Sequence, residues 1–202
     1  MNSCITCKEA IEHCMSTHTF AFAHLYGDEK IMDMHIHNCC EVYYSISGGK
    51  QFLIDHCLYD IRPGDLFLIN QFESHHLTQI DQQTHERIIL SIDPEYLSKL
   101  STGVTDLGHC FSFRDTRMPH QIHLSPKEQN RFMYFIHELH DDGGMGEDLL
   151  DQAIFLELMV FLNRAFAARC TDAAAPAQAP SSNYHAQVDA ILSYINPNIG
   201  EP

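Results

Sequence analysis

Positive charge is scarce in this chain. It has 12 Lys and Arg against 27 Asp and Glu, which gives a formal net charge of −15 at pH 7. The cations stand almost singly, and Arg114 and Arg117 come nearest to forming a pair. Proteins that bind duplex DNA use clustered Lys and Arg to neutralise phosphates. We therefore expect no DNA binding by these residues alone.

Long apolar segments are also lacking. No run reaches the roughly 18 apolar residues that a membrane-spanning helix needs. The first residues, Met1 to Cys4, do not have the charged and apolar regions of a secretion signal. We therefore expect a soluble, cytoplasmic protein with no membrane partner. Of the eight cysteines, Cys39 and Cys40 are adjacent, which together with the missing signal favours reduced thiols over a disulfide framework.

The N-terminal cysteines allow two interpretations. Cys4, Cys7, His13 and Cys14 are residue types that can complete a tetrahedral zinc site. The cysteines also fall at helical spacing among apolar residues, which predicts the buried face of a short helix in an N-terminal arm, residues 1–19. The helical interpretation is the stronger, because ligands one turn apart arise readily by chance where Cys is frequent.

From about Phe20 to Ile92 the apolar residues come in short runs. Turn signals at Gly48-Gly49 and Pro63-Gly64 separate the runs, and Asp93-Pro94 ends the region before a brief helix at 94–100. Regular short strands with such turns predict a barrel or sandwich. The expected strands include 41–46, 51–54, 65–69 and 87–92.

Three histidines and a glutamate form the most informative polar set. Successive side chains of a strand point to opposite faces, so His35 and His37 share a face. Glu41, on the strand after an intervening loop, can return to the same side, and His75 follows later. Such a set suits a divalent transition metal, namely Zn, Ni, Mn or Fe. It suits an organic ligand equally well, and the spacing does not choose between the two.

This spacing resembles the paired motifs of the cupin superfamily. The likeness also includes Gly48 and Pro63-Gly64-Asp65, and it departs at Glu29 and Phe72, where the family usually has Gly. In cupins a small β-barrel turns three His and one Glu toward its interior. The resemblance implies a cupin-like, double-stranded β-helix barrel over residues 20–124.

After the barrel region the apolar period changes from 2 to 3.6, which predicts two helices over residues 125–170. Ser125 caps the first, with Pro126 at its first position and Glu128 three residues after the cap. The second, from Glu147 to Arg169, is apolar on two sides and needs two partners. We expect one side to cover the barrel and the other to pair with a second copy, although a larger monomeric core would also explain the pattern. The residues assigned to the dimer interface are Leu150, Ile154, Leu158 and Leu162.

Residues 171–184 are rich in Ala, Pro and Ser and predict a linker. A helical pattern restarts at Val188 and stops at Pro197, so residues 185–202 predict the beginning of a truncated domain. This order of elements, with segments such as Arg62 to Asn70, resembles the sensor half of an AraC-type transcriptional regulator. The overall fold class is thus mainly β with α.

The AraC-type resemblance implies a small-molecule effector in the barrel, a sugar being one candidate. It also implies a homodimer and DNA contact through a missing C-terminal helix-turn-helix domain. We therefore expect an effector-sensing and dimerisation domain and no enzyme. The alternative is a metal-dependent cupin enzyme, a dioxygenase or isomerase, which the His and Glu set would serve. The residues expected to line the effector pocket are His35, His37, Glu41, Tyr43, His75 and Arg87.

Overall fold

The computed structural model describes residues 6–27, 34–49, 51–79, 85–112, 120–139 and 144–172. The expected linker and truncated domain, residues 171–184 and 185–202, lie outside these ranges except for the end of the last helix. None of the helices described is long and apolar enough to cross a membrane.

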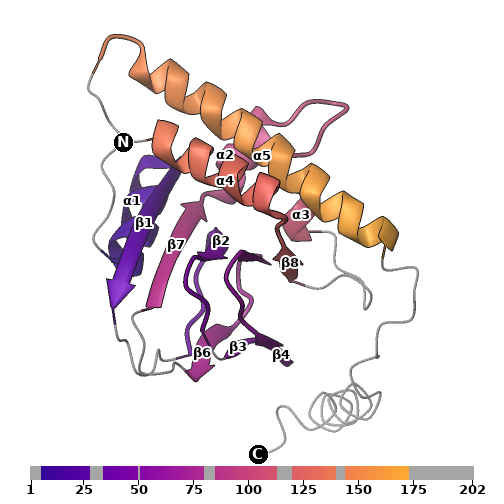
Figure 1. Cartoon of the computed structure of the whole chain (residues 1–202). Coiled ribbons are helices and arrows are strands. Elements are labelled where there is room, and N and C mark those ends of the chain that lie inside the picture. The colour runs from indigo at the N-terminus through magenta and orange to yellow at the C-terminus, as the bar shows by residue number, and fades with distance from the viewer. Residues whose placement is uncertain are drawn as a thin grey trace, which may run out of the picture.

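Two antiparallel sheets form the β part of the molecule (Figure 1). The five-stranded sheet has the order β1-β7-β2-β5-β8 and the three-stranded sheet the order β4-β3-β6. Three of the expected strands match β2, β3 and β5 to within one residue, whereas the short strands β4, β6 and β8 were not expected. The strands are β1 (Phe20–Gly27), β2 (Cys40–Ser45), β3 (Gln51–Ile54), β4 (Cys57–Asp60), β5 (Asp65–Ile69), β6 (His75–Gln79), β7 (His85–Ile92) and β8 (Gln121–His123).

The helices lie before and after the strands, apart from β8, and the predicted fold class, mainly β with α, is confirmed. Ser125 caps α4 through the expected capping box with Glu128, and Thr6 caps α1 in the same way with Glu9. On α1, Cys14 is buried and His13 is exposed, as the helical interpretation requires. The helices are α1 (Cys7–Thr17), α2 (Pro94–Leu100), α3 (His109–Ser112), α4 (Pro126–Glu138) and α5 (Glu147–Asp172).

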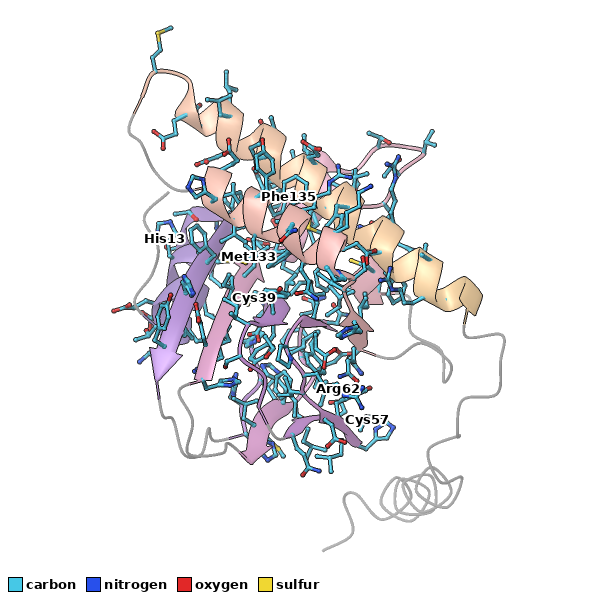
Figure 2. All side chains as sticks on the ribbon, viewed as in Figure 1. His13, Cys39, Cys57, Arg62, Met133 and Phe135 are labelled. Carbon is cyan, nitrogen blue, oxygen red and sulfur yellow. The ribbon has the colours of Figure 1, made fainter. Side chains whose placement is uncertain are left out.

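The five-stranded sheet separates two apolar cores. One face, which includes Val42 and Leu90, packs against the helical layer of α4 and α5. The other face, which includes Tyr43 and Phe67, packs against the three-stranded sheet and α1. Figures 1 and 2 show α4 and α5 lying together over the sheet, with Met133 and Phe135 labelled on α4. The predicted apolar stripe of this helix is buried, at Phe132, Phe135, Ile136 and Leu139.

The turn Pro63-Gly64-Asp65 packs the barrel against the helical layer. Gly64 has φ +86°, a conformation that favours glycine, and a Cβ there would force the side chain of Gln129 on α4 to move. Asp65, which is 1% exposed, accepts bonds from the Arg62 amide (2.6 Å), Gln121 Nε2 (2.8 Å) and His123 Nδ1 (2.8 Å). One buried carboxylate thus ties β5 to both ends of β8.

The four residues assigned to the dimer interface differ in burial along α5. Leu158 and Leu162 are fully buried in the core of a single chain, so their assignment to an exposed interface was wrong. Leu150, near the start of the helix, is 66% exposed, and Ile154 is half-buried. The C-terminal half of α5 packs on α3, α4 and β8, whereas its first turn does not.

An ion pair joins the last turns of α5 to the start of α4. Arg169 donates to both carboxylate oxygens of Glu128, at 2.8 and 2.7 Å, and also to the carbonyl of His123 at 3.0 Å. The guanidinium is the main cause that lowers the pKa of Glu128 from its usual range to about 2. Because the pKa falls on folding, the pair stabilises the fold above pH ~4.5 and less as pH falls toward 2.

We predict that Arg169→Gln lowers the free energy of unfolding by about 1 kcal/mol at pH 7. The difference from the unsubstituted chain should shrink between pH 5 and pH 3, because Glu128 then becomes protonated in the unfolded state. Denaturant unfolding at several pH values measures it. The control is Arg131→Gln, which breaks an ion pair between α4 and α5 with Glu157, whose two side chains are more than half exposed. This variant should lose less free energy of unfolding than Arg169→Gln. If Arg169→Gln lowers the free energy of unfolding by the same amount at every pH, the loss does not come from the ion pair with Glu128.

Candidate functional site

The three histidines and Glu41 meet where the two sheets approach each other. His35 and His75 form an isolated β-bridge with backbone bonds of 3.2 and 3.1 Å, which makes them cross-strand neighbours. His75 is the first residue of β6 in the three-stranded sheet, whereas His35 lies outside the named strands. Glu41 lies on β2 of the five-stranded sheet, two residues after the loop that carries His37. The structure therefore brings all four predicted residues together.

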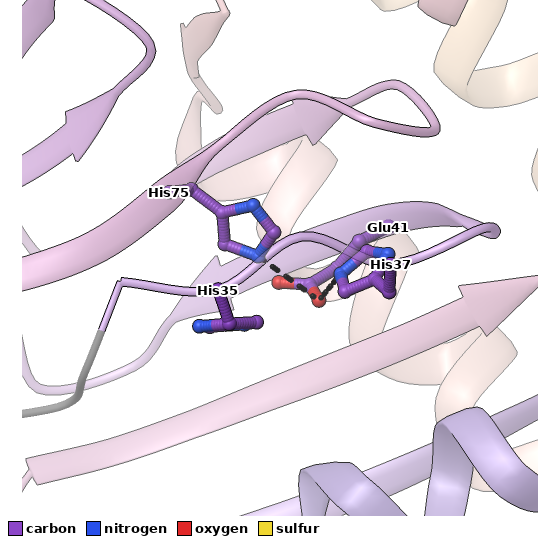
Figure 3. A group of neighbouring side chains, drawn as sticks. All are labelled: His35, His37, Glu41 and His75. Atoms are coloured by element: carbon purple, nitrogen blue, oxygen red, sulfur yellow. Dashed lines mark hydrogen bonds and ion pairs between the residues drawn. The ribbon is translucent and has the colours of Figure 1, made fainter.

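The four side chains are close enough to share one ion (Figure 3). One ligand atom from each lies within 4.8 Å of all the others. Glu41 Oε2 is 3.0 Å from His37 Nε2 and 3.7 Å from His75 Nε2. Glu41 and His75 are buried, whereas His35 and His37 are intermediate in exposure, so the cluster has a buried side and a side nearer to solvent.

The second ring nitrogens of two histidines fix how those rings point. His37 Nδ1 bonds to the carbonyl of Cys39 (3.0 Å) and His75 Nδ1 to the carbonyl of Glu73 (2.9 Å). A carbonyl only accepts, so each Nδ1 carries the proton and each Nε2 is the atom that faces Glu41. His75 Nε2 is buried without a hydrogen-bond partner among the described residues. This arrangement is typical of histidines that bind a metal through Nε2, so the residues present fit a divalent ion.

The charges of the cluster are strongly coupled. Burial acts to raise the pKa of Glu41, but the hydrogen bond from His37 and the close approach of His75 outweigh it and lower the pKa overall. Burial likewise lowers the pKa of His37, while its bonds to Cys39 and Glu41 prevail and raise it to about 10. A cation that binds here must displace the proton from Nε2, so metal uptake should release protons.

The remaining two predicted residues lie farther along the interior. Tyr43 shares the face of Glu41, and its hydroxyl donates to His85 Nε2 at 2.5 Å. Arg87 is buried but pairs in register with Ser45, four residues beyond Glu41, or about 13 Å along the strand. The structure does not bring Arg87 to the histidine cluster.

An aromatic layer fills part of the interior beside the cluster. Tyr43, Phe52 and Phe67 pack with ring centroids 4.9 to 5.9 Å apart, and Phe52 lies 6.0 Å from the ring of His75. Sequence reasoning missed His85, which is held between Tyr43 and the Gly48 carbonyl (2.6 Å). Its spacing of two from Arg87 on a strand was the available signal.

The turn between β5 and β6 carries backbone strain next to the cluster. Phe72 has φ +64°, a conformation that favours glycine, at the position where the cupin resemblance expects Gly. Its side chain is 63% exposed, so little packing compensates for the strain. Its amide donates to the carbonyl of His37 at 2.9 Å. The strained turn thus holds the segment that carries His37 beside the segment that leads to His75.

The family is shown by comparison with known sequences. The chain matches the family model of the AraC-like ligand binding domain over residues 19–159 and belongs to that family. This match confirms the resemblance to the sensor half of an AraC-type regulator. A comparison with curated proteins finds no match.

Several solved structures have a partial likeness to this chain. A variant of oxalate decarboxylase OxdC from Bacillus subtilis is 21% identical over 37% of this chain and 21% of its own (TM-score 0.34). The DMSP lyase DddQ from Ruegeria pomeroyi DSS-3 is 21% identical over 37% of this chain and 38% of its own (TM-score 0.33). An RmlC-like cupin from Shewanella frigidimarina NCIMB 400 is 17% identical over 37% of this chain and 67% of its own (TM-score 0.34). This chain thus spans about a fifth of the decarboxylase and under two fifths of the lyase.

We predict that Phe72→Gly stabilises the fold by about 0.5–1 kcal/mol. Relief of left-handed strain is worth about 1–2 kcal/mol, and the greater freedom of glycine in the unfolded chain offsets about half of it. Denaturant unfolding measures the change. Phe72→Ala keeps the strain and serves as the control, with an expected effect near zero. A loss of stability in Phe72→Gly would show that the exposed ring makes a compensating contact.

Proposed function

We propose that this chain is the effector-sensing and dimerisation domain of an AraC-type transcription regulator, and that a divalent transition metal helps to hold its effector. The ligand-binding family supports the sensing role. The observation that carries the metal is the pair of histidines whose Nδ1 atoms donate to carbonyls and whose Nε2 atoms face a buried carboxylate. In this proposal, contact with DNA belongs to a separate domain and not to these acidic residues.

The ligand set suggests which effectors fit. Three imidazoles and one carboxylate leave open positions on an octahedral Mn, Fe or Ni ion, whereas they would complete a tetrahedral Zn site. An effector with hydroxyl or carboxylate oxygens, such as a sugar or a small acid, can occupy open positions on the side of His35 and His37, nearer to solvent. Tyr43 and Arg87 remain effector candidates only for a ligand that reaches past the aromatic layer.

The metal-dependent cupin enzyme is the second candidate, because the same four ligands can support catalysis. The two functions differ in what happens to the bound molecule. A sensor releases its effector unchanged, whereas a dioxygenase or isomerase converts it. Native mass spectrometry of the metal-loaded protein with its co-purifying ligand, before and after incubation, separates them.

We predict that the protein purifies with about one equivalent of a divalent transition metal. The double substitution His37→Ala and His75→Ala should abolish it, since it removes two of four ligands and leaves Glu41 without cationic partners. Elemental analysis measures the content. His56→Ala, an exposed histidine in the turn between β3 and β4, is the matched control and should retain the metal. Metal-free protein after supplementation with Mn, Fe, Ni and Zn would refute the metal part of the proposal.

The exposed start of α5 supports dimerisation. Leu149 and Leu150 are 67% and 66% exposed, and Tyr134 on the adjacent α4 is 51% exposed. Large apolar side chains at the surface of a helical pair are typical of an interface between subunits. We therefore assign the dimer contact to the first turn of α5, together with the outer face of α4.

We predict that Leu149→Glu with Leu150→Glu converts a dimer into a folded monomer, because both side chains are exposed within one chain. Light scattering gives the mass, and circular dichroism reports folding. The contrasting variant is Leu158→Glu, which buries a charge in the core and should cost more than about 4 kcal/mol. A double variant that stays dimeric would move the interface elsewhere.

A further inference from the structure

The turn at residues 70–74 contacts the histidine cluster through its backbone and a more distant group through a side chain. The carbonyl of Glu73 accepts the Nδ1 proton of His75 at 2.9 Å. The carboxylate of the same residue accepts from the amide of Asn70 at 2.6 Å, which closes the turn. Glu73 is therefore the residue that links the orientation of His75 to the shape of the turn.

The carboxylate of Glu73 also contacts His120, which directly precedes β8. His120 Nε2 lies 3.2 Å from Glu73 Oε2, an electrostatic contact rather than an aligned hydrogen bond. Its Nδ1 bonds to the hydroxyl of Tyr59 on β4 at 2.9 Å. The side chains of His120 and Glu73 are 11% and 16% exposed, so little water screens the contact. His120 is held on both sides of its ring.

From His120 the contacts continue to the end of α5. β8 starts at the next residue and ends at His123, whose carbonyl accepts from Arg169 Nη2 at 3.0 Å. Arg169 lies in the last turns of α5 and also holds Glu128. A series of polar contacts and one three-residue strand thus join the cluster to the C-terminal end of the helical layer.

We propose that Glu73 and His120 are positioning residues of the metal site and that they couple its occupancy to Arg169 at the end of α5. The inference rests on the proposed metal-assisted sensing. A cation on His75 Nε2 makes Nδ1–H a stronger donor, which holds the carbonyl of Glu73 more firmly. The side chain of Glu73 is then fixed against His120, and β8 carries the constraint to the His123 carbonyl.

The coupling is reciprocal, so it can be measured from either end. The test is the affinity of the 202-residue chain for Zn²⁺, measured by competition with a chromogenic chelator. Glu73→Gln and His120→Gln should weaken Zn²⁺ binding about 10-fold, although neither residue is a ligand. Arg169→Gln should weaken it about 5-fold through β8.

Arg131→Gln is the matched control, because it breaks an ion pair between the same two helices outside the route. Its Zn²⁺ affinity should be unchanged. Equal losses in Arg131→Gln and Arg169→Gln would show a general effect of helix packing and overturn the coupling. If His120→Gln does not fold, Tyr59→Phe removes only the hydroxyl that holds His120 and should act in the same direction with a smaller effect.

Hydrogen exchange distinguishes coupling from a purely structural role of His120, because a structural role would not make exchange at the end of α5 depend on Zn²⁺. Zn²⁺ should slow exchange of amides at 165–172 in the unsubstituted chain and leave it unaltered in His120→Gln. Zn²⁺ binding with no effect at 165–172, or unchanged Zn²⁺ affinity in Glu73→Gln and His120→Gln, overturns this inference and leaves the sensing proposal intact. An unsubstituted chain that binds no Zn²⁺ overturns the inference together with the metal part of the proposed function.

Discussion

The alternation of side chains along β2 is the constraint on which the rest of the molecule depends. Val42 and Tyr44 point to the helical layer, while Glu41 and Tyr43 point to the barrel interior. β2 is also central in its sheet, with β7 and β5 as neighbours. A shift of register by one residue would bury Glu41 against the helices. It would also turn Val42 and Tyr44, which now pack against the helical layer, into the barrel interior. The fold and the site are therefore set by the same strand.

The burial of Glu41 explains why the histidines are part of the fold. An ionised carboxylate with no partner costs several kcal/mol in a protein interior. His37 and His75 supply opposite charge next to it, which lowers the pKa of the carboxyl and keeps it ionised. A divalent ion would supply the same compensation while releasing the protons. The polar cluster is thus stable as a protonated group and remains ready to exchange its protons for a metal.

Local signals in the sequence predicted much of this fold. The Ser125 cap, the strands at 51–54 and 65–69 and the buried stripe of α4 follow from a few neighbouring residues, and each is confirmed. The spacing of the histidines and Glu41, through its resemblance to the cupin motifs, predicted a set that does converge. The cap, the two strands and the stripe of α4 are decided within about one turn or one hairpin, whereas His75 joins its partners through a bridge to the distant His35.

The features that sequence reasoning missed depend on contacts between distant segments. Arg87 shares a face with Glu41, but the pairing of β7 with β2 places it opposite Ser45. Leu158 is buried because α5 packs against α3, α4 and β8, and helical periodicity alone cannot say which partner covers a face. Phe72 adopts a left-handed conformation in a turn whose amide bonds to the carbonyl of the distant His37. Register, packing partner and imposed strain are tertiary properties.

β8 is the shortest of the described strands, and it contacts both β5 and α5. β8 has three residues and pairs along one edge with β5, so few backbone bonds hold it. Side-chain bonds to Asp65 and the bond from Arg169 to the His123 carbonyl complete its attachment. The longer central strands β2 and β7 cannot move without disrupting both cores. The proposed coupling from the site to the helical layer therefore runs through β8, whose position a few polar bonds decide.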